Sequence, residues 1–96
     1  MPHFVLIATD GEGVSEKRKA ARPEHVARLK QLNEEGRLIV AGPCPLEDTP
    51  EVMSGSIIIA EFDSMKEARS WAALDPYVAA GVYTDVLIKP FIKALA

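Results

Sequence analysis

Two residues of this 96-residue chain, His25 and Asp75, have side chains that could together move a proton. Histidine takes up or releases a proton near neutral pH, because its ordinary pKa is about 6.5. A carboxylate that binds one imidazole nitrogen fixes the tautomer and makes the other nitrogen more basic. If the fold brings the two residues together, they form a general acid or base. The alternative is a histidine that packs against the core and uses the aspartate only to satisfy its hydrogen bond.

Three further side chains are candidates for binding or chemistry. Arg22 could hold a carboxylate or phenolate oxygen with its guanidinium, or it could face solvent beside Pro23. Tyr77 could orient a ligand through its hydroxyl, or its ring could fill part of the core. Cys44 lies between two prolines, where a nucleophile could be presented, but no residue near it in the sequence would activate the thiol.

The composition is that of an ordinary globular protein and excludes several classes of function. The net charge of −3 predicts no binding to nucleic acid or to an anionic membrane, and no apolar run is long enough to span a bilayer. Two distant histidines are a weak metal signal, and no glycine-rich phosphate loop is present. We therefore expect one domain over residues 1–96, without metal or cofactor. A single cysteine fits a reducing cytoplasm.

His25 must be positioned by a helix that the sequence marks at both ends. Pro23 suits the first helical position, where its missing N–H would be unpaired anyway. Gly36 suits the left-handed conformation in which helices end. Between them, His25 lies four residues before Leu29 and seven before Leu32, so it shares their inward face. Asp75 follows a second helix and begins a short connector.

The remaining elements follow from alternation, turn residues and a capping box formed by Ser64 and Glu67. Residues 43–50 contain three prolines and are predicted to be a loop. The predicted order is a strand at 3–9, a solvated short helix or turn at 15–21, a helix at 23–35, a strand at 37–42, a strand at 55–62, a helix from 65 that ends before Pro76, a possible helical turn within 75–81, a strand at 82–90 and a tail at 91–96.

This βαββαβ order predicts an α+β, ferredoxin-like fold, with a four-stranded antiparallel sheet and both helices on one face. Several aliphatic residues should then lie on the open face of the sheet, because their alternation partners face the helices: Val5, Ile7, Ile39, Ile57 and Ile59. A monomer rarely exposes such a patch. We expect a homodimer that packs through this face. The alternative is that the C-terminal tail covers part of it.

Several motifs resemble those of the YciI-like proteins, and together they cover nearly the whole chain. They are Arg22-Pro-Glu-His25, Glu35-Gly-Arg-Leu38 with Ala41-Gly-Pro43, Ala60-Glu-Phe62, Asp75-Pro-Tyr77-Val-Ala-Ala-Gly-Val-Tyr83 and Val86-Leu-Ile-Lys-Pro-Phe91. The resemblance implies a dimeric α/β-barrel assembly and a His–Asp active site at His25 and Asp75. The resemblance also implies an activity like that of the muconolactone isomerases, or the dehydrochlorination of a chlorinated hydroxyquinol.

Three functions remain open at this point. The first is a cofactor-free enzyme that acts on a small polar or aromatic molecule by elimination or isomerisation, with Arg22 or Tyr77 holding the substrate. The second is a non-catalytic, dimeric metabolite-binding module, because a fold does not determine its function. The third is an interaction protein that binds no small molecule.

Overall fold

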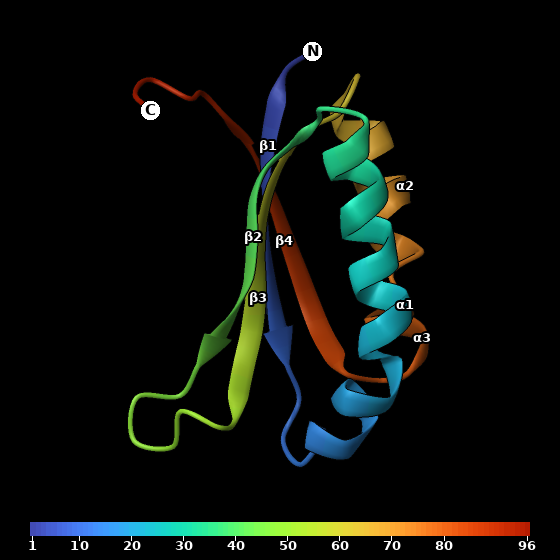
Figure 1. The fold of residues 1–96 in the computed structure, drawn as a ribbon, viewed down its shortest axis with the longest axis vertical. Helices are drawn as coiled ribbons and strands as arrows, with labels where there is room; N and C mark the ends of the chain where they lie inside the picture. The colour runs from blue at the N-terminus through green and yellow to red at the C-terminus, as the bar shows by residue number, and fades with distance from the viewer.

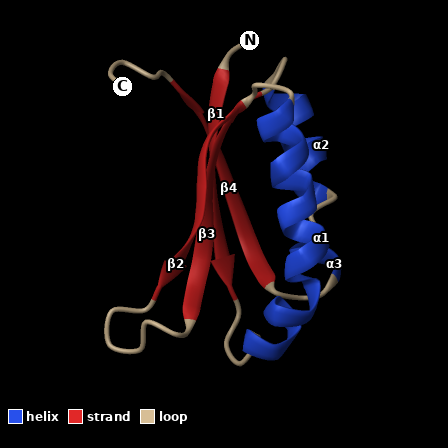
Figure 2. Cartoon of the chain, viewed as in Figure 1, coloured by secondary structure: helices blue, strands red, loops and turns tan.

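The computed structural model describes residues 1–96, in which four antiparallel strands form one sheet and the helices cover one of its faces (Figure 1). The elements in chain order are β1 (His3–Asp10), α1 (Ser15–Glu34), β2 (Leu38–Pro45), β3 (Met53–Glu61), α2 (Met65–Ala73), α3 (Pro76–Ala79) and β4 (Tyr83–Phe91). The strand order across the sheet is β2-β3-β1-β4. Figure 2 shows the two layers edge-on. The predicted ferredoxin-like architecture is confirmed.

Helix α1 is one continuous helix, so the prediction of a short helix or turn followed by a helix starting at Pro23 is wrong. Pro23 lies inside the helix, where it cannot donate a hydrogen bond to the carbonyl of Lys19. The turns before Pro23 are held by tertiary contacts instead. Arg18 is anchored to the sheet, and Val14 at the N-cap packs with buried residues of α3 and its flank. The preference of proline for the first turn of a helix is therefore outweighed here by contacts with residues distant in sequence.

Strand β2 continues through Pro43 and Pro45, although this stretch was predicted to be a loop. The physical reason is its place in the sheet, because β2 is an edge strand that pairs with β3 only. A proline on an edge strand removes no ladder hydrogen bond when its nitrogen faces away from the neighbour. The pairing shifts register between Leu38 and Val40 and again between Cys44 and Pro45. This strand runs beside α1 and forms one wall of the site described below.

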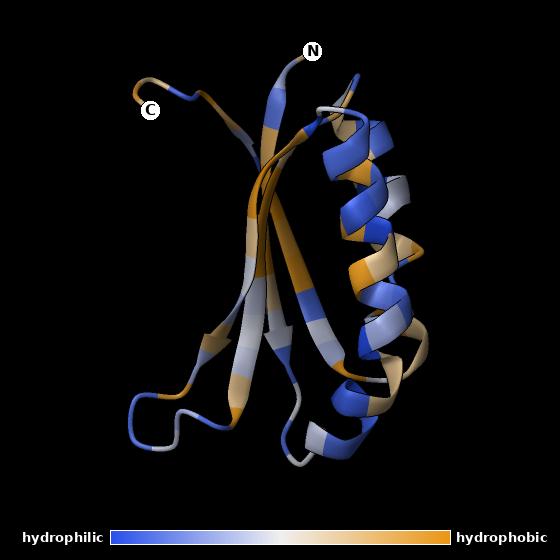
Figure 3. Ribbon diagram, in the orientation of Figure 1, coloured by the Kyte–Doolittle hydropathy of each residue, from blue (hydrophilic) through white to orange (hydrophobic).

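The core lies between the helices and the covered face of the sheet. Hydrophobic colouring in Figure 3 concentrates on the strands, whereas α1 is largely hydrophilic. The buried cluster consists of Phe4, Leu6, Leu32, Ile58, Ala60, Phe62, Ala68 and Ala72. The predicted capping box is confirmed at α2, because the Ser64 side chain accepts a hydrogen bond from the Glu67 N–H at 3.2 Å. Gly36 has a φ of 74°, as its predicted position after α1 requires.

The opposite face of the sheet is uncovered and aliphatic. Ile7 of β1 pairs with Ile57 of β3 on one side and with Leu87 of β4 on the other, and directly paired residues share a face. These three side chains remain 37–47% exposed. The C-terminal tail does not cover them, because it extends away from the sheet with Ile92 86% exposed (Figure 1). No helix of the chain has the length and apolar character needed to cross a membrane.

Candidate active site

His25 and Asp75 meet across fifty residues of sequence and form a buried pair. The Nδ1 atom of His25 lies 2.9 Å from Oδ2 and 3.0 Å from Oδ1 of Asp75, and both residues are almost inaccessible to solvent. An ionised carboxylate only accepts hydrogen bonds, so Nδ1 carries the proton and donates it to Asp75. The other ring nitrogen, Nε2, makes no hydrogen bond and is not fully buried. This nitrogen is free to accept a proton.

Local sequence places Asp75 with the geometry that the pair requires. Asp75 is the N-cap of α3, and its Oδ1 accepts a hydrogen bond of 2.9 Å from the backbone N–H of Tyr77. Pro76 occupies the first helical position, where it is tolerated. The predicted helical turn within residues 75–81 is thereby confirmed as α3. Its cap binds one carboxylate oxygen and so helps to orient the side chain toward His25.

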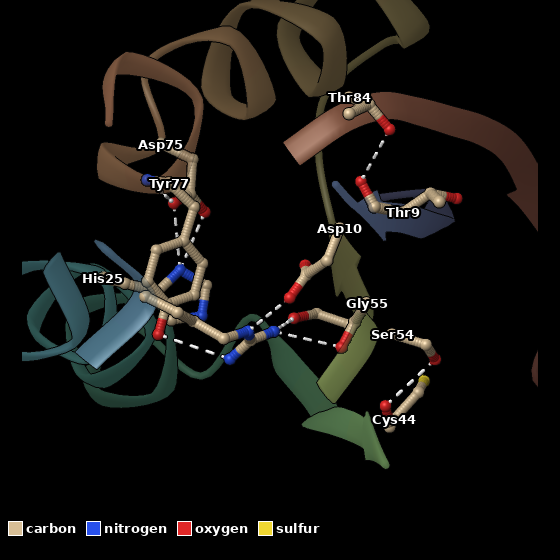
Figure 4. Close-up of polar contacts among 11 residues, drawn as sticks. Thr9, Asp10, His25, Cys44, Ser54, Gly55, Asp75, Tyr77 and Thr84 are labelled. Carbon is tan, nitrogen blue, oxygen red and sulfur yellow. Dashed lines mark hydrogen bonds and ion pairs between the residues drawn. The ribbon is translucent and has the colours of Figure 1, made fainter. Parts of the chain in front are cut away.

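An aromatic side chain forms the floor under the imidazole. The ring of Tyr77 stacks on His25 with centroids 4.1 Å apart and an interplanar angle of 18°. Tyr83 meets both rings edge-on. Figure 4 shows Tyr77 lying across His25, with Asp75 above the imidazole. The imidazole is therefore packed against aromatic rings at its face and at its edge.

Arg18 connects this cluster to the sheet. Its Nε donates to Asp10 Oδ2 at 2.8 Å, and its Nη2 donates to Ser56 Oγ at 2.6 Å and to the Gly55 carbonyl at 3.0 Å. The guanidinium also lies 4.7 Å from the Tyr77 ring centre, with Nη1 at 3.4 Å from the hydroxyl. Gly55 must be glycine here, because a Cβ would meet the backbone oxygen of β1 at 2.0 Å. Arg18 therefore fixes the position of the Tyr77 ring.

Sequence reasoning missed Arg18, Asp10 and Ser56. A signal for Arg18 was present, because it lies four residues before Arg22 and seven before His25, which is the spacing of one helix face. That spacing has meaning only if α1 runs unbroken through Pro23. Asp10 and Ser56 carried no local signal, because they reach the site through strand pairing.

The site keeps both tyrosines in the protonated form. Burial raises the pKa of Tyr77, and the nearby guanidinium of Arg18 opposes this rise. Burial also raises the pKa of Tyr83 strongly. Ser56 lies close enough to oppose that rise in part, although the buried Tyr83 hydroxyl makes no hydrogen bond of good geometry. Neither phenol is a source of negative charge at neutral pH.

A cavity of about 220 Å³ opens between α1 and β2 beside the pair. Its lining consists of Arg18, Arg22, His25, Val26, Leu29, Ala41, Gly42, Pro43, Ser56, Ile58 and Tyr77. The volume suits a small molecule with a single ring. A larger open hollow of about 560 Å³ lies against α2 and β4, but it contains neither His25 nor Asp75. Of these two cavities, only the smaller one is lined by His25.

The structure brings all four predicted site residues to one region, with different surroundings from those expected. Arg22 lies within α1 rather than before it, and its exposed side chain lines the cavity. Tyr77 is completely buried, so it contributes its ring rather than a free hydroxyl. Cys44 is a partly buried free thiol on β2 and does not line the cavity. His3 pairs with Glu61 at 3.5 Å and takes no part in the site.

The sequence profile of the YCII-related domain matches residues 2–92, which is nearly the full length. The chain belongs to the YCII-related family. YciI of Escherichia coli strain CFT073 is 49% identical over 94 residues, covering 94% of this chain and 96% of that protein. An uncharacterized protein of Haemophilus influenzae is 48% identical over 95 residues, covering 95% of this chain and 97% of that protein.

The chain resembles the solved structure of an enzyme. The chain superposes on 5-chloro-2-hydroxyhydroquinone dehydrochlorinase (TftG) from Burkholderia phenoliruptrix AC1100, in complex with 2,5-dihydroxybenzoquinone, with a TM-score of 0.84. The two are 26% identical, and the match covers 94% of this chain and 93% of TftG. An antibiotic biosynthesis monooxygenase matches at a TM-score of 0.55 with 11% identity, which shows the shared fold alone.

Proposed function

We propose that this protein is an enzyme that uses His25 as a general base, oriented by Asp75, on a small hydroxylated or halogenated ring. The observation that carries the proposal is the geometry of one imidazole. Nδ1 is held by a buried carboxylate, while Nε2 is left unpaired on a residue that lines a cavity. The likeness to TftG, a dehydrochlorinase with a dihydroxybenzoquinone bound, supports a substrate of this size and class.

The reaction class is elimination of HX or an isomerisation by proton transfer. His25 Nε2 takes a proton from the substrate, and the electron pair of the broken bond forms a new double bond. In an elimination the group X leaves as an anion with the electron pair of its bond to carbon, whereas in an isomerisation His25 returns the proton to another atom of the substrate. Asp75 stabilises the imidazolium through Nδ1–H. Arg22 lines the same cavity and would hold a substrate oxygen.

Replacing Asp75 with asparagine tests the pair directly through the imidazole tautomer. With the carboxylate present, neutral His25 holds its proton on Nδ1. A carboxamide can donate to Nδ1 instead, so the Asp75→Asn variant should move the proton to Nε2 and remove the base. Nitrogen chemical shifts of the His25 ring distinguish the two tautomers. The exposed Asp48→Asn replacement is the matched control and should leave the ring unchanged. An identical tautomer in Asp75→Asn would contradict the pair.

We also propose that two copies associate through the open sheet face. The aliphatic patch crosses the central strands, since Ile7 is flanked by Ile57 and Leu87, and the next row pairs Val5 with Ile59. Partly exposed aliphatic side chains of this kind gain on the order of 1 kcal/mol each when a partner removes them from water.

The Ile7→Lys variant should convert a dimer into a monomer, because it places a charge at the centre of this patch. Sedimentation velocity measures the mass of each species. The control is Leu74→Lys, which adds the same charge at a residue that is 75% exposed beside the helices. A wild-type protein that sediments as a monomer at a concentration of tens of micromolar would contradict the dimer proposal.

A further inference from the structure

A second cavity, of about 230 Å³, adjoins the cavity beside His25. Its lining consists of Ser15, Arg18, Lys19, Arg22, Pro43, Glu51 and Met53. Arg18, Arg22 and Pro43 line both cavities, so the two form one cleft along α1. The inner part contains His25, and we call the part lined by Lys19 and Glu51 the outer subsite.

The outer subsite is basic in a chain whose net charge is −3. Three cationic side chains line it, against the single carboxylate of Glu51. Arg18 is already committed to Asp10 and to the sheet. Lys19 and Arg22 form no ion pair and no side-chain hydrogen bond within the chain, whereas the buried or structural cations of this protein do. Two unpaired cations therefore remain at one end of the cleft.

The helix sets how far these cations lie from the base. Arg22 lies three residues before His25, and Lys19 lies six residues before His25. At 1.5 Å per residue, these separations are about 4.5 and 9 Å along the helix axis. A six-membered ring with its substituents has a length similar to the separation of Arg22 from His25. A ring held at His25 in the inner cavity would thus present a substituent to Arg22 and Lys19.

We propose that the outer subsite binds an anionic group of the substrate, so that the natural substrate is a small ring compound carrying a carboxylate or a phosphate. Arg22 would bind the anion with two parallel hydrogen bonds, and Lys19 would act as a point charge beyond it. This extends the proposed function by naming the substrate class. The claim concerns binding, so it can be tested without turnover.

The test is to compare the affinities of three matched probes for the full chain by isothermal titration calorimetry. Hydroquinone is neutral, 2,5-dihydroxybenzoate adds a carboxylate, and 4-hydroxyphenyl phosphate carries a phosphate ester. We expect one of the two anions to bind at least roughly tenfold more tightly than hydroquinone, because charge-assisted hydrogen bonds are stronger than neutral ones. The preferred anion distinguishes a carboxylate source from a phosphate source. Equal affinity for all three probes would overturn the proposal.

Variants then locate the preference on the molecule. Lys19→Gln should reduce the anion preference several-fold while leaving hydroquinone affinity nearly unchanged, because Lys19 does not line the inner cavity. Arg22→Gln should also reduce the anion preference, and it should weaken hydroquinone binding to a smaller extent, since Arg22 lines both cavities. Lys66→Gln removes an exposed charge on α2, outside both cavities, and should keep the full preference. A preference that survives the Arg22→Gln/Lys19→Gln double variant would place the anion elsewhere and overturn the proposal.

The outcome for catalysis is separable from the outcome for binding. His25→Asn retains Arg22 and Lys19, so it should keep the anion preference even without any base. A protein that prefers the anion but turns over no substrate would support the outer subsite and count against the proposed reaction. A protein that eliminates HX but has no preference for the anion would support the proposed reaction and count against the outer subsite.

Discussion

The His25→Asn variant is expected to lose turnover by about 10²–10⁴-fold, the usual contribution of a general base, while its fold is retained. Asparagine can place its amide N–H near the position of Nδ1, so Asp75 keeps a hydrogen-bond donor. The group lost is Nε2, which makes no hydrogen bond and belongs to a residue that lines the cavity. Chloride release from 5-chloro-2-hydroxyhydroquinone, the compound that TftG is named for, is the first assay to use.

Two controls separate loss of the base from loss of structure. His3→Asn alters the other histidine of the chain, which pairs with Glu61 outside the site, and should keep full turnover. His25→Gln keeps a polar group toward the cavity but removes the donor to Asp75, so it should lose both turnover and stability. Unchanged chloride release in His25→Asn would contradict the role of the imidazole. No turnover of halogenated or hydroxylated rings by the wild type would favour the binding module instead.

The Arg18→Met variant is expected to lower the free energy of unfolding by about 3–5 kcal/mol, the range for removing one partner of a buried ion pair. The Asp10 side chain is only 1% exposed and would lose its counterion in a site that water barely reaches. Ser56 and the Gly55 carbonyl would also lose a donor. This loss is large against a total stability of about 5–15 kcal/mol for a domain, and urea unfolding measures it.

Matched variants show whether the buried charge is the cause. The Asp10→Asn/Arg18→Met double variant removes the stranded charge and should recover part of the loss. Glu35→Gln breaks the ion pair with Arg37, where the glutamate is 40% exposed, and should cost less than about 1 kcal/mol. If Arg18→Met costs no more than Glu35→Gln, Arg18 is not the anchor of this site.

Signals that act over a few residues were predicted correctly. Ser64 caps α2 through the Glu67 N–H, and Asp75 begins a helical turn with proline after it. Gly36 ends α1 with a positive φ. Alternation also separated the covered face from the open face, because side chains on a strand point to opposite sides in turn. The βαββαβ order follows from these local features.

The errors occurred where distant contacts outweigh local preference. A proline in a helix normally lies in the first turn, yet α1 continues through Pro23 because its first turns are anchored by Arg18 and Val14. Prolines normally exclude a strand, yet β2 contains Pro43 because it is an edge strand with one neighbour. Neither fact can be read within a window of neighbouring residues, since both depend on which element lies alongside.

The sequence by itself determined the fold class and named His25 and Asp75 as a candidate pair. Only the tertiary structure decided that the pair forms, because two residues fifty positions apart meet through the packing of α1 against α3. The same holds for Arg18, whose partners come from β1, β3 and α3. Helix caps and alternation are short-range effects, so they can be recognised from residues that are close in sequence. The site is built from long-range contacts, and these become visible only when the chain is folded.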